Sequence, residues 1–223
     1  MAQEKVLQME RDAASRFAAS WGPTAKVRVR TVWPGTAVLK GDFEKVLVDL
    51  RDGRSDRIDM VIDPSLKDKG RIKTLSLRAR NTFLAGARFD EVQIQFHEVR
   101  YGKEAFNRRH ELVFAEPPSG TFSIWASGNI GEAKLAIKGS TITVQQGDLT
   151  LVGRPVVKGN GLSLADVEAK RGTQTIDPQL PLRFFENLAN PGRASRTLSF
   201  VAEAVRIEGQ RLRIDGRVGA ANP

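Results

Sequence analysis

The stretch KTLSLRAR at residues 73–80 alternates apolar and polar side chains without a break. The stretch EVQIQF at residues 91–96 repeats this alternation, and the residues around Phe83 and Leu84 are expected to form the turn between the two. A period of two is typical of β-strands that bury one face. Because parallel neighbours need a crossover of a dozen or more residues, so short a connection predicts an antiparallel pair.

The same period of two covers most of the chain after Lys26. Turn-forming pairs separate the alternating stretches at short intervals. These pairs are Asp52-Gly53, Asp63-Pro64, Lys69-Gly70, Lys138-Gly139, Gln146-Gly147, Asn160-Gly161 and Glu208-Gly209. The spacing predicts about a dozen strands in a long antiparallel meander.

Two segments have a helical period instead. Apolar side chains recur at steps of three and four between Val6 and Trp21, before the helix stop Gly22-Pro23. A second, short helix is predicted from Pro181 to Ala189. The sequence therefore predicts an α+β fold: one domain over 1–223, in which an amphipathic helix over 1–22 lies on a long antiparallel meander over 26–219.

Composition narrows the class of protein. The chain has 223 residues, a net charge of +9, 40% hydrophobic residues and no cysteine. At this length folding buries about 70% of the surface, so neither disulfides nor metal are needed for stability. Without cysteine, thiol nucleophiles and cysteine-bound metals are excluded. The sequence has no run of ~20 apolar residues that could span a membrane. Ala2-Gln3 is interpreted as the possible start of an exported chain after removal of its signal peptide.

Catalytic motifs are missing from the sequence. The two histidines, His97 and His110, fall in a basic region, and no nucleophile elbow, metalloprotease motif or phosphate loop occurs. Asp56, Asp59 and Asp63 lie close in sequence, but arginines are interleaved with them, which favours a solvated edge over a metal site. We therefore expect no enzyme activity, no cofactor and no metal.

Positive charge is concentrated in one part of the chain. Between Leu66 and His110 eleven basic residues stand against five acidic ones. Such a region attracts phosphate on a lipid surface or a nucleic acid, or serves only as a solvated face. Nucleic acid is not the expected partner, because no aromatic residue is interleaved along 74–80. The candidate headgroup or anion contacts are Arg71, Lys73, Arg78, Arg80, Arg88, Arg108 and Arg109.

Large apolar residues also occur where a core does not obviously require them. A curved sheet closed by a helix encloses either a packed core or an elongated apolar cavity, and the sequence period does not distinguish the two. The candidate contacts to a lipid chain are Phe17, Trp21, Trp33, Phe83, Leu84, Phe89, Phe96, Phe122, Trp125 and Phe185.

Several motifs, taken in order, resemble the LmeA-like family of envelope proteins. The run 29–46 around Trp33-Pro34 resembles the family's first strand, proline turn and following strand. The similarity continues through the strand and turn at 142–147, the short helix at 181–191 and the final hairpin at 205–216. The chain departs from the family at 117–122, where Pro-Pro-Ser-Gly-Thr-Phe replaces a frequent helix start.

The resemblance implies an extracytoplasmic, phospholipid-binding protein of the cell envelope or periplasm. Its expected architecture is of the tubular lipid-binding type, in which a highly curved antiparallel sheet wraps the N-terminal helix. The expected function is therefore non-catalytic binding, or transfer, of a phospholipid or other acyl lipid in an apolar groove, with the basic region against anionic headgroups or a membrane surface. The alternatives are a structural envelope module that binds other proteins and a module that binds polyanions. The oligomeric state is left open.

Overall fold

The computed structural model describes residues 2–33, 41–109, 111–130, 133–190 and 195–221. His110, residues 34–40 of the stretch that resembles the LmeA-like family, and Pro191 lie outside these ranges. The described helices are Ala2–Ala19 (α1), Lys103–Arg109 (α2) and Gln179–Leu188 (α3). The helices predicted near the N-terminus and near Pro181 are present, whereas α2 was not predicted.

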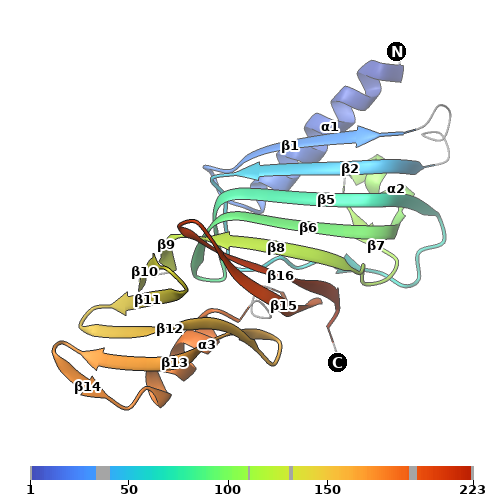
Figure 1. The fold of residues 1–223 in the computed structure, drawn as a ribbon. Helices are drawn as coiled ribbons and strands as arrows, with labels where there is room; N and C mark the ends of the chain where they lie inside the picture. Colours follow the sequence, from blue (N-terminus) through green and yellow to red (C-terminus); the bar gives the residue numbers. More distant parts are fainter. Residues whose placement is uncertain (1, 34–40, 110, 131–132, 191–194, 222–223) are drawn as a thin grey trace.

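Two sheets lie side by side (Figure 1). The first has the order β1-β2-β5-β6-β8-β16-β15, with three short strands beside this path. Its strands are Lys26–Val32 (β1), Asp42–Arg51 (β2), Arg54–Ser55 (β3), Val61–Ile62 (β4), Lys69–Leu84 (β5), Ala87–Gly102 (β6), Val113–Phe114 (β7), Gly120–Ala126 (β8), Leu198–Glu208 (β15) and Arg211–Ala220 (β16).

The second sheet is a meander in the order β14-β13-β12-β11-β10-β9. Its strands are Gly128–Ile130 (β9), Ala133–Lys138 (β10), Thr141–Gln146 (β11), Leu149–Lys158 (β12), Gly161–Arg171 (β13) and Gln174–Ile176 (β14). α3 covers it through Phe185, which is buried, and Glu186, which accepts a hydrogen bond from Ser163. The buried side chains of both sheets form one continuous cluster.

The prediction of an α+β, mainly antiparallel fold is confirmed, but the described strands form two sheets rather than one meander, and the pairs β2–β5, β3–β5 and β4–β7 are parallel. β2 and β5 pair with Val46 opposite Leu75. They can be parallel because residues 52–68 form a long crossover between them. The predicted turn at Lys69-Gly70 is wrong: Gly70 lies inside β5, where a Cβ atom would approach the Gly41 carbonyl oxygen to 2.5 Å and the Tyr101 ring to 2.6 Å.

The first sheet bends where its strands interrupt the alternation of buried and exposed residues. Asp52 and Asn81 have positive φ angles of 56° and 50°, and the Asn81 amide donates a 2.6 Å hydrogen bond to the Asp52 carboxylate. Along β5 both Ala79 and Thr82 are buried, so the inward face shifts by one residue at Asn81. Irregularities of this kind bend a strand and increase its twist, which gives the sheet a concave face.

α1 lies on the concave side, against β1 (Figure 1). Its Glu10 carboxylate accepts hydrogen bonds from the backbone N–H of Thr31 at 2.6 Å and from its hydroxyl at 2.7 Å. At the end of the helix, Phe17 stacks on Trp21 with 6.2 Å between ring centroids. These contacts fix the helix against the first strands of the sheet.

Candidate functional site

The concave face of the first sheet holds two apolar cavities. The larger, which we call the helix-side cavity, has a volume of about 390 Å³ and lies under α1. Most of its lining is apolar: Ala13, Phe17, Val29, Val46, Val48, Ile58, Met60, Val61, Ile72, Leu75, Leu77, Phe96, Phe106, Leu112 and Phe114. Its polar lining residues are Arg16, Ser20, Asp59 and Glu111.

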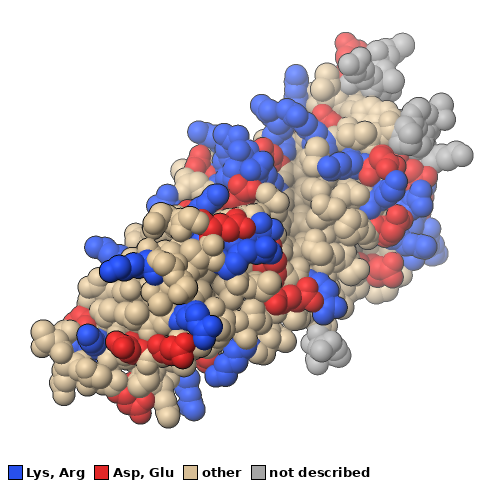
Figure 2. Space-filling view, in the orientation of Figure 1, with Lys and Arg blue, Asp and Glu red and all other residues tan. Residues whose placement is uncertain are grey.

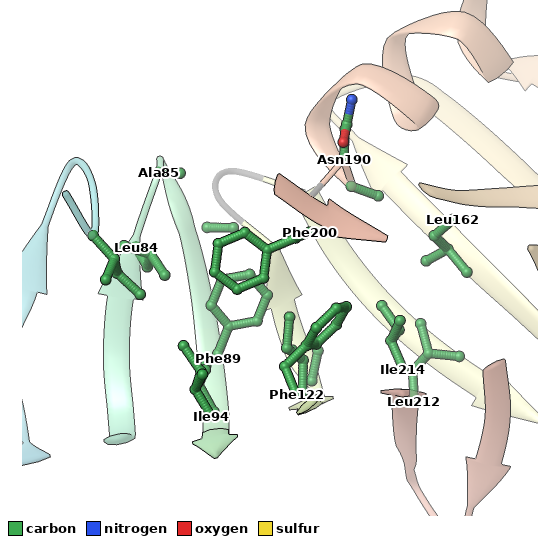
Figure 3. A pocket seen from close by; sticks show the side chains of 16 residues that line it. Leu84, Ala85, Phe89, Ile94, Phe122, Leu162, Asn190, Phe200, Leu212 and Ile214 are labelled. Atoms are coloured by element: carbon green, nitrogen blue, oxygen red, sulfur yellow. The ribbon is translucent and has the colours of Figure 1, made fainter. Parts of the chain in front are cut away.

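The smaller space, which we call the junction cavity, lies where the two sheets meet and measures only about 50 Å³. The rings of Phe89, Phe122 and Phe200 converge on it (Figure 3). Phe122 and Phe200 pack edge to face, with 5.4 Å between ring centroids. Because about 30 Å³ holds a single water molecule, this end of the concave face is essentially packed, whereas the end under α1 is hollow.

Alternation along the strands builds the floor of the helix-side cavity. Val46 and Val48 on β2 and Leu75 and Leu77 on β5 project to the same face. The helix supplies the roof, with the small side chain of Ala13 above the floor. A small residue at this position leaves a space that a larger side chain would fill.

Residues 54–60 cross the concave face between the two cavities, and Ile58 lines both. The Asp59 carboxylate accepts a 2.8 Å hydrogen bond from the Arg196 backbone N–H. The Met60 backbone N–H donates to the Thr197 hydroxyl at 3.0 Å. The crossover is therefore tied to the segment that leads into β15.

Five of the ten predicted lipid contacts line these cavities. Phe17 and Phe96 line the helix-side cavity, and Leu84, Phe89 and Phe122 line the junction cavity. The sequence-based selection therefore favoured the packed end over the hollow one.

The other five predicted contacts lie elsewhere. Trp21 is buried at the end of α1, Trp33 packs against the core just beyond β1, and Phe185 is buried under the second sheet. Phe83 and Trp125 lie on the outer face of the first sheet, beneath the guanidinium groups of Arg54 at 5.1 Å and Arg213 at 4.9 Å respectively. These five side chains line neither the helix-side cavity nor the junction cavity.

The predicted basic contacts do not converge on either cavity. Most are paired with carboxylates, and Figure 2 shows basic and acidic side chains intermixed over the visible face. The ion pairs are Arg71–Glu98 (3.7 Å), Lys73–Glu44 (2.7 Å), Arg78–Glu91 (2.8 Å), Arg80–Asp49 (2.6 Å), Arg108–Glu104 (3.0 Å) and Arg109–Glu111 (3.1 Å). Arg88 donates to the Asn81 side chain. This surface is closer to neutral than its basic residues alone suggest.

One predicted cation does lie near the rim of the helix-side cavity. Arg109 shares the Glu111 carboxylate with Arg16 of α1, which lies 3.3 Å from it. Glu111 and Arg16 both line the cavity. The pair links α1 to the chain that follows α2 across the rim.

Trp125 belongs to a polar network on the outer face. Its indole N–H donates to Glu208 at 3.2 Å, and Arg213 bonds both Glu208 and Asp215. Partial burial raises the pKa of the Asp215 carboxyl, but hydrogen bonds from Ser123, Arg206 and Arg213 outweigh this effect and hold the pKa below its usual value.

Asp215→Asn is expected to destabilise the protein at neutral pH and to lose that effect in acid. A carboxyl whose folded pKa is lowered stabilises the fold above its unfolded pKa of about 3.9, and this stabilisation is lost as pH falls through the folded pKa. Urea unfolding of both proteins between neutral pH and pH ~2.5 measures the difference. A difference in unfolding free energy that stays constant over this range would contradict the prediction.

Sequence reasoning missed most of the residues of the helix-side cavity. The alternation did identify Leu75 and Leu77 as lying on one face, but it did not distinguish a packed core from a cavity lining, and neither residue was among the candidate lipid contacts. Phe106 lies on the unpredicted helix α2, and the sequence gives no signal that brings it under α1. Ala13 offered a signal, since a small residue on the apolar stripe of a helix leaves room beneath it.

Comparisons with protein-family models, curated proteins and solved structures give no match. The resemblance to the LmeA-like family accordingly stays a prediction. Within the described ranges, no helix is long and apolar enough to cross a membrane, and no group of three or more histidine or acidic side chains is arranged to hold a metal ion.

Proposed function

We propose that the protein binds an acyl lipid without chemical conversion, with the chain in the helix-side cavity. The observation that carries this proposal is a hollow of about 390 Å³, roofed by α1 and lined mainly by apolar side chains. Small-molecule sites typically measure ~300–1,000 Å³ and are lined mostly by apolar residues. The space is a partly open apolar groove that is large enough to take a small apolar ligand.

The volume suits one acyl chain. If a methylene group needs about as much room as a water molecule, ~30 Å³, the cavity takes on the order of a dozen methylenes. Each methylene removed from water contributes ~0.8 kcal/mol. The apolar gain alone, on the order of 10 kcal/mol, outweighs a moderate cost of association.

The polyanion alternative is less favoured by the surface. Phosphate backbones bind to unneutralised lysine and arginine side chains, whereas four basic residues of β5, namely Arg71, Lys73, Arg78 and Arg80, pair with acids on the neighbouring strands β2 and β6. Binding to other envelope proteins stays an alternative. Protein partners captured by crosslinking, with no lipid bound to the protein, would favour it. An extracytoplasmic location is part of the proposal, supported by the family resemblance alone.

The test is mass spectrometry of organic extracts from the full chain, purified without detergent. We expect an acyl lipid to co-purify, and the emptied protein to take up a fluorescent acyl lipid from phosphatidylethanolamine–phosphatidylglycerol vesicles. Protein unfolded in urea and processed identically controls for carry-over. If no lipid is extracted and none is taken up, the proposal is overturned.

A further inference from the structure

A polar basin adjoins the helix-side cavity. Ser20, Arg54, Ser55, Asp56, Arg57 and Asp59 line it. Ser20 and Asp59 also line the apolar cavity. The two spaces share these lining residues and are therefore neighbours, so a ligand whose chain lies under α1 could place a polar end in the basin.

The basin carries two positive and two negative charges that are largely uncommitted. Within the described part of the chain, Arg54, Arg57 and Asp56 make no ion pair, and one carboxylate oxygen of Asp59 accepts the Arg196 N–H and a longer bond from Ser195. By contrast, the Glu111 carboxylate on the rim of the helix-side cavity already pairs with two arginines, Arg16 and Arg109. Charges that lack internal partners are available to a ligand.

Contacts hold the backbone of this segment and the side chains of Arg54 and Asp59 in place before any ligand binds, whereas the side chains of Asp56 and Arg57 are exposed. The Arg54 backbone N–H donates to the Trp21 carbonyl at 2.8 Å, and its guanidinium lies over the Phe83 ring. The Ser55 hydroxyl donates to the Arg57 carbonyl at 2.7 Å. Asp59 is fixed by the Arg196 N–H. A preorganised site loses less conformational freedom on binding than a flexible one.

We propose that this basin binds the zwitterionic headgroup of a single-chain phospholipid, a lysophosphatidylethanolamine-type molecule, whose acyl chain fills the helix-side cavity. The proposal rests on the proposed function and specifies its ligand. Arginine binds phosphate through charge-assisted, often bidentate hydrogen bonds, and the aspartates suit the ammonium group. A purely anionic headgroup would face Asp56 and Asp59 without a compensating cation. The cavity volume selects one chain rather than two.

The test compares three ligands that share one acyl chain, below their micelle-forming concentrations, by isothermal titration calorimetry. They are lysophosphatidylethanolamine, lysophosphatidylglycerol and the neutral monoacylglycerol. The delipidated full chain is expected to bind lysophosphatidylethanolamine about fivefold more tightly than lysophosphatidylglycerol, since an exposed ion pair contributes up to ~1 kcal/mol. Monoacylglycerol reports on the cavity alone.

Two substitutions test the negative and the positive charges of the basin separately. Asp56→Asn is expected to remove the preference between the two phospholipids. Arg57→Gln is expected to weaken the binding of both phospholipids about fivefold and to leave the affinity for monoacylglycerol unchanged. Arg183→Gln, at an exposed position on α3, is the matched control and should change none of the three affinities. Because Asp56 and Arg57 are exposed, both variants should fold, which thermal unfolding checks.

The outcomes distinguish the two proposals. If monoacylglycerol binds but the wild-type protein shows no preference between the phospholipids, the headgroup proposal is overturned and acyl-chain binding stands. If Asp56→Asn and Arg57→Gln leave every affinity unchanged, the headgroup proposal is likewise overturned. If none of the three ligands binds, both proposals fail.

Discussion

Ala13→Trp is expected to remove bound lipid while the protein stays folded. Ala13 points from α1 into the helix-side cavity, so an indole at this position occupies space that a chain would take. Displacing only four methylenes costs ~3 kcal/mol of binding, which corresponds to more than about 100-fold in affinity. Lipid content per folded molecule, measured by mass spectrometry together with circular dichroism, checks the prediction.

The matched control for this experiment is Ala19→Trp. Ala19 lies on the same helix, is exposed and does not line the cavity. We expect this variant to retain its lipid. Equal lipid content in both tryptophan variants and in the wild-type protein would place the chain somewhere other than the helix-side cavity.

Gly120→Ala is expected to destabilise the protein by at least about 3 kcal/mol, because the added methyl group meets backbone rather than a movable side chain. A Cβ atom at Gly120 would overlap the Gln95 carbonyl oxygen and lie 2.9 Å from the Phe96 Cα. For a chain of this size, such a loss lowers the melting temperature by about 6–12 °C. Differential scanning calorimetry checks this expectation.

Gly219→Ala is the control for the glycine experiment. Gly219 lies in β16, and a Cβ atom there would have no neighbour within 4 Å. Its unfolding free energy should change by no more than about 0.5 kcal/mol. Similar melting temperatures for the two alanine variants would mean that β6 and β8 are not as closely paired as described.

The individual strands were predictable because each alternates buried and exposed side chains independently of its neighbours. Residues 74–80 and 91–96 face as predicted because local alternation suffices when one face is buried. The parallel pairing of β2 with β5 was not predictable, because it depends on where the crossover 52–68 lies. The bend at Asn81 depends on a positive φ angle, for which asparagine is only a weak indication.

The site was less predictable than the fold. Whether an inward-facing side chain such as Leu75 is packed or lines a hollow depends on how far α1 stands from the sheet. That distance is set by long-range contacts such as Glu10 with Thr31. The basic region was misleading for a related reason, because residues close in sequence along β5 lie beside acids from β2, as Lys73 does beside Glu44.

The parallel pairing of β2 with β5 has a consequence for how the chain assembles. β5 and β6 can pair as a local hairpin, whereas β2 reaches β5 only after the loop 52–68 has closed, and non-local pairing of this kind forms slowly. We therefore expect α1, β1 and β2 to dock onto β5 only after the hairpin of β5 and β6 has formed. These elements include the roof of the helix-side cavity, so their transient detachment would uncover its apolar lining.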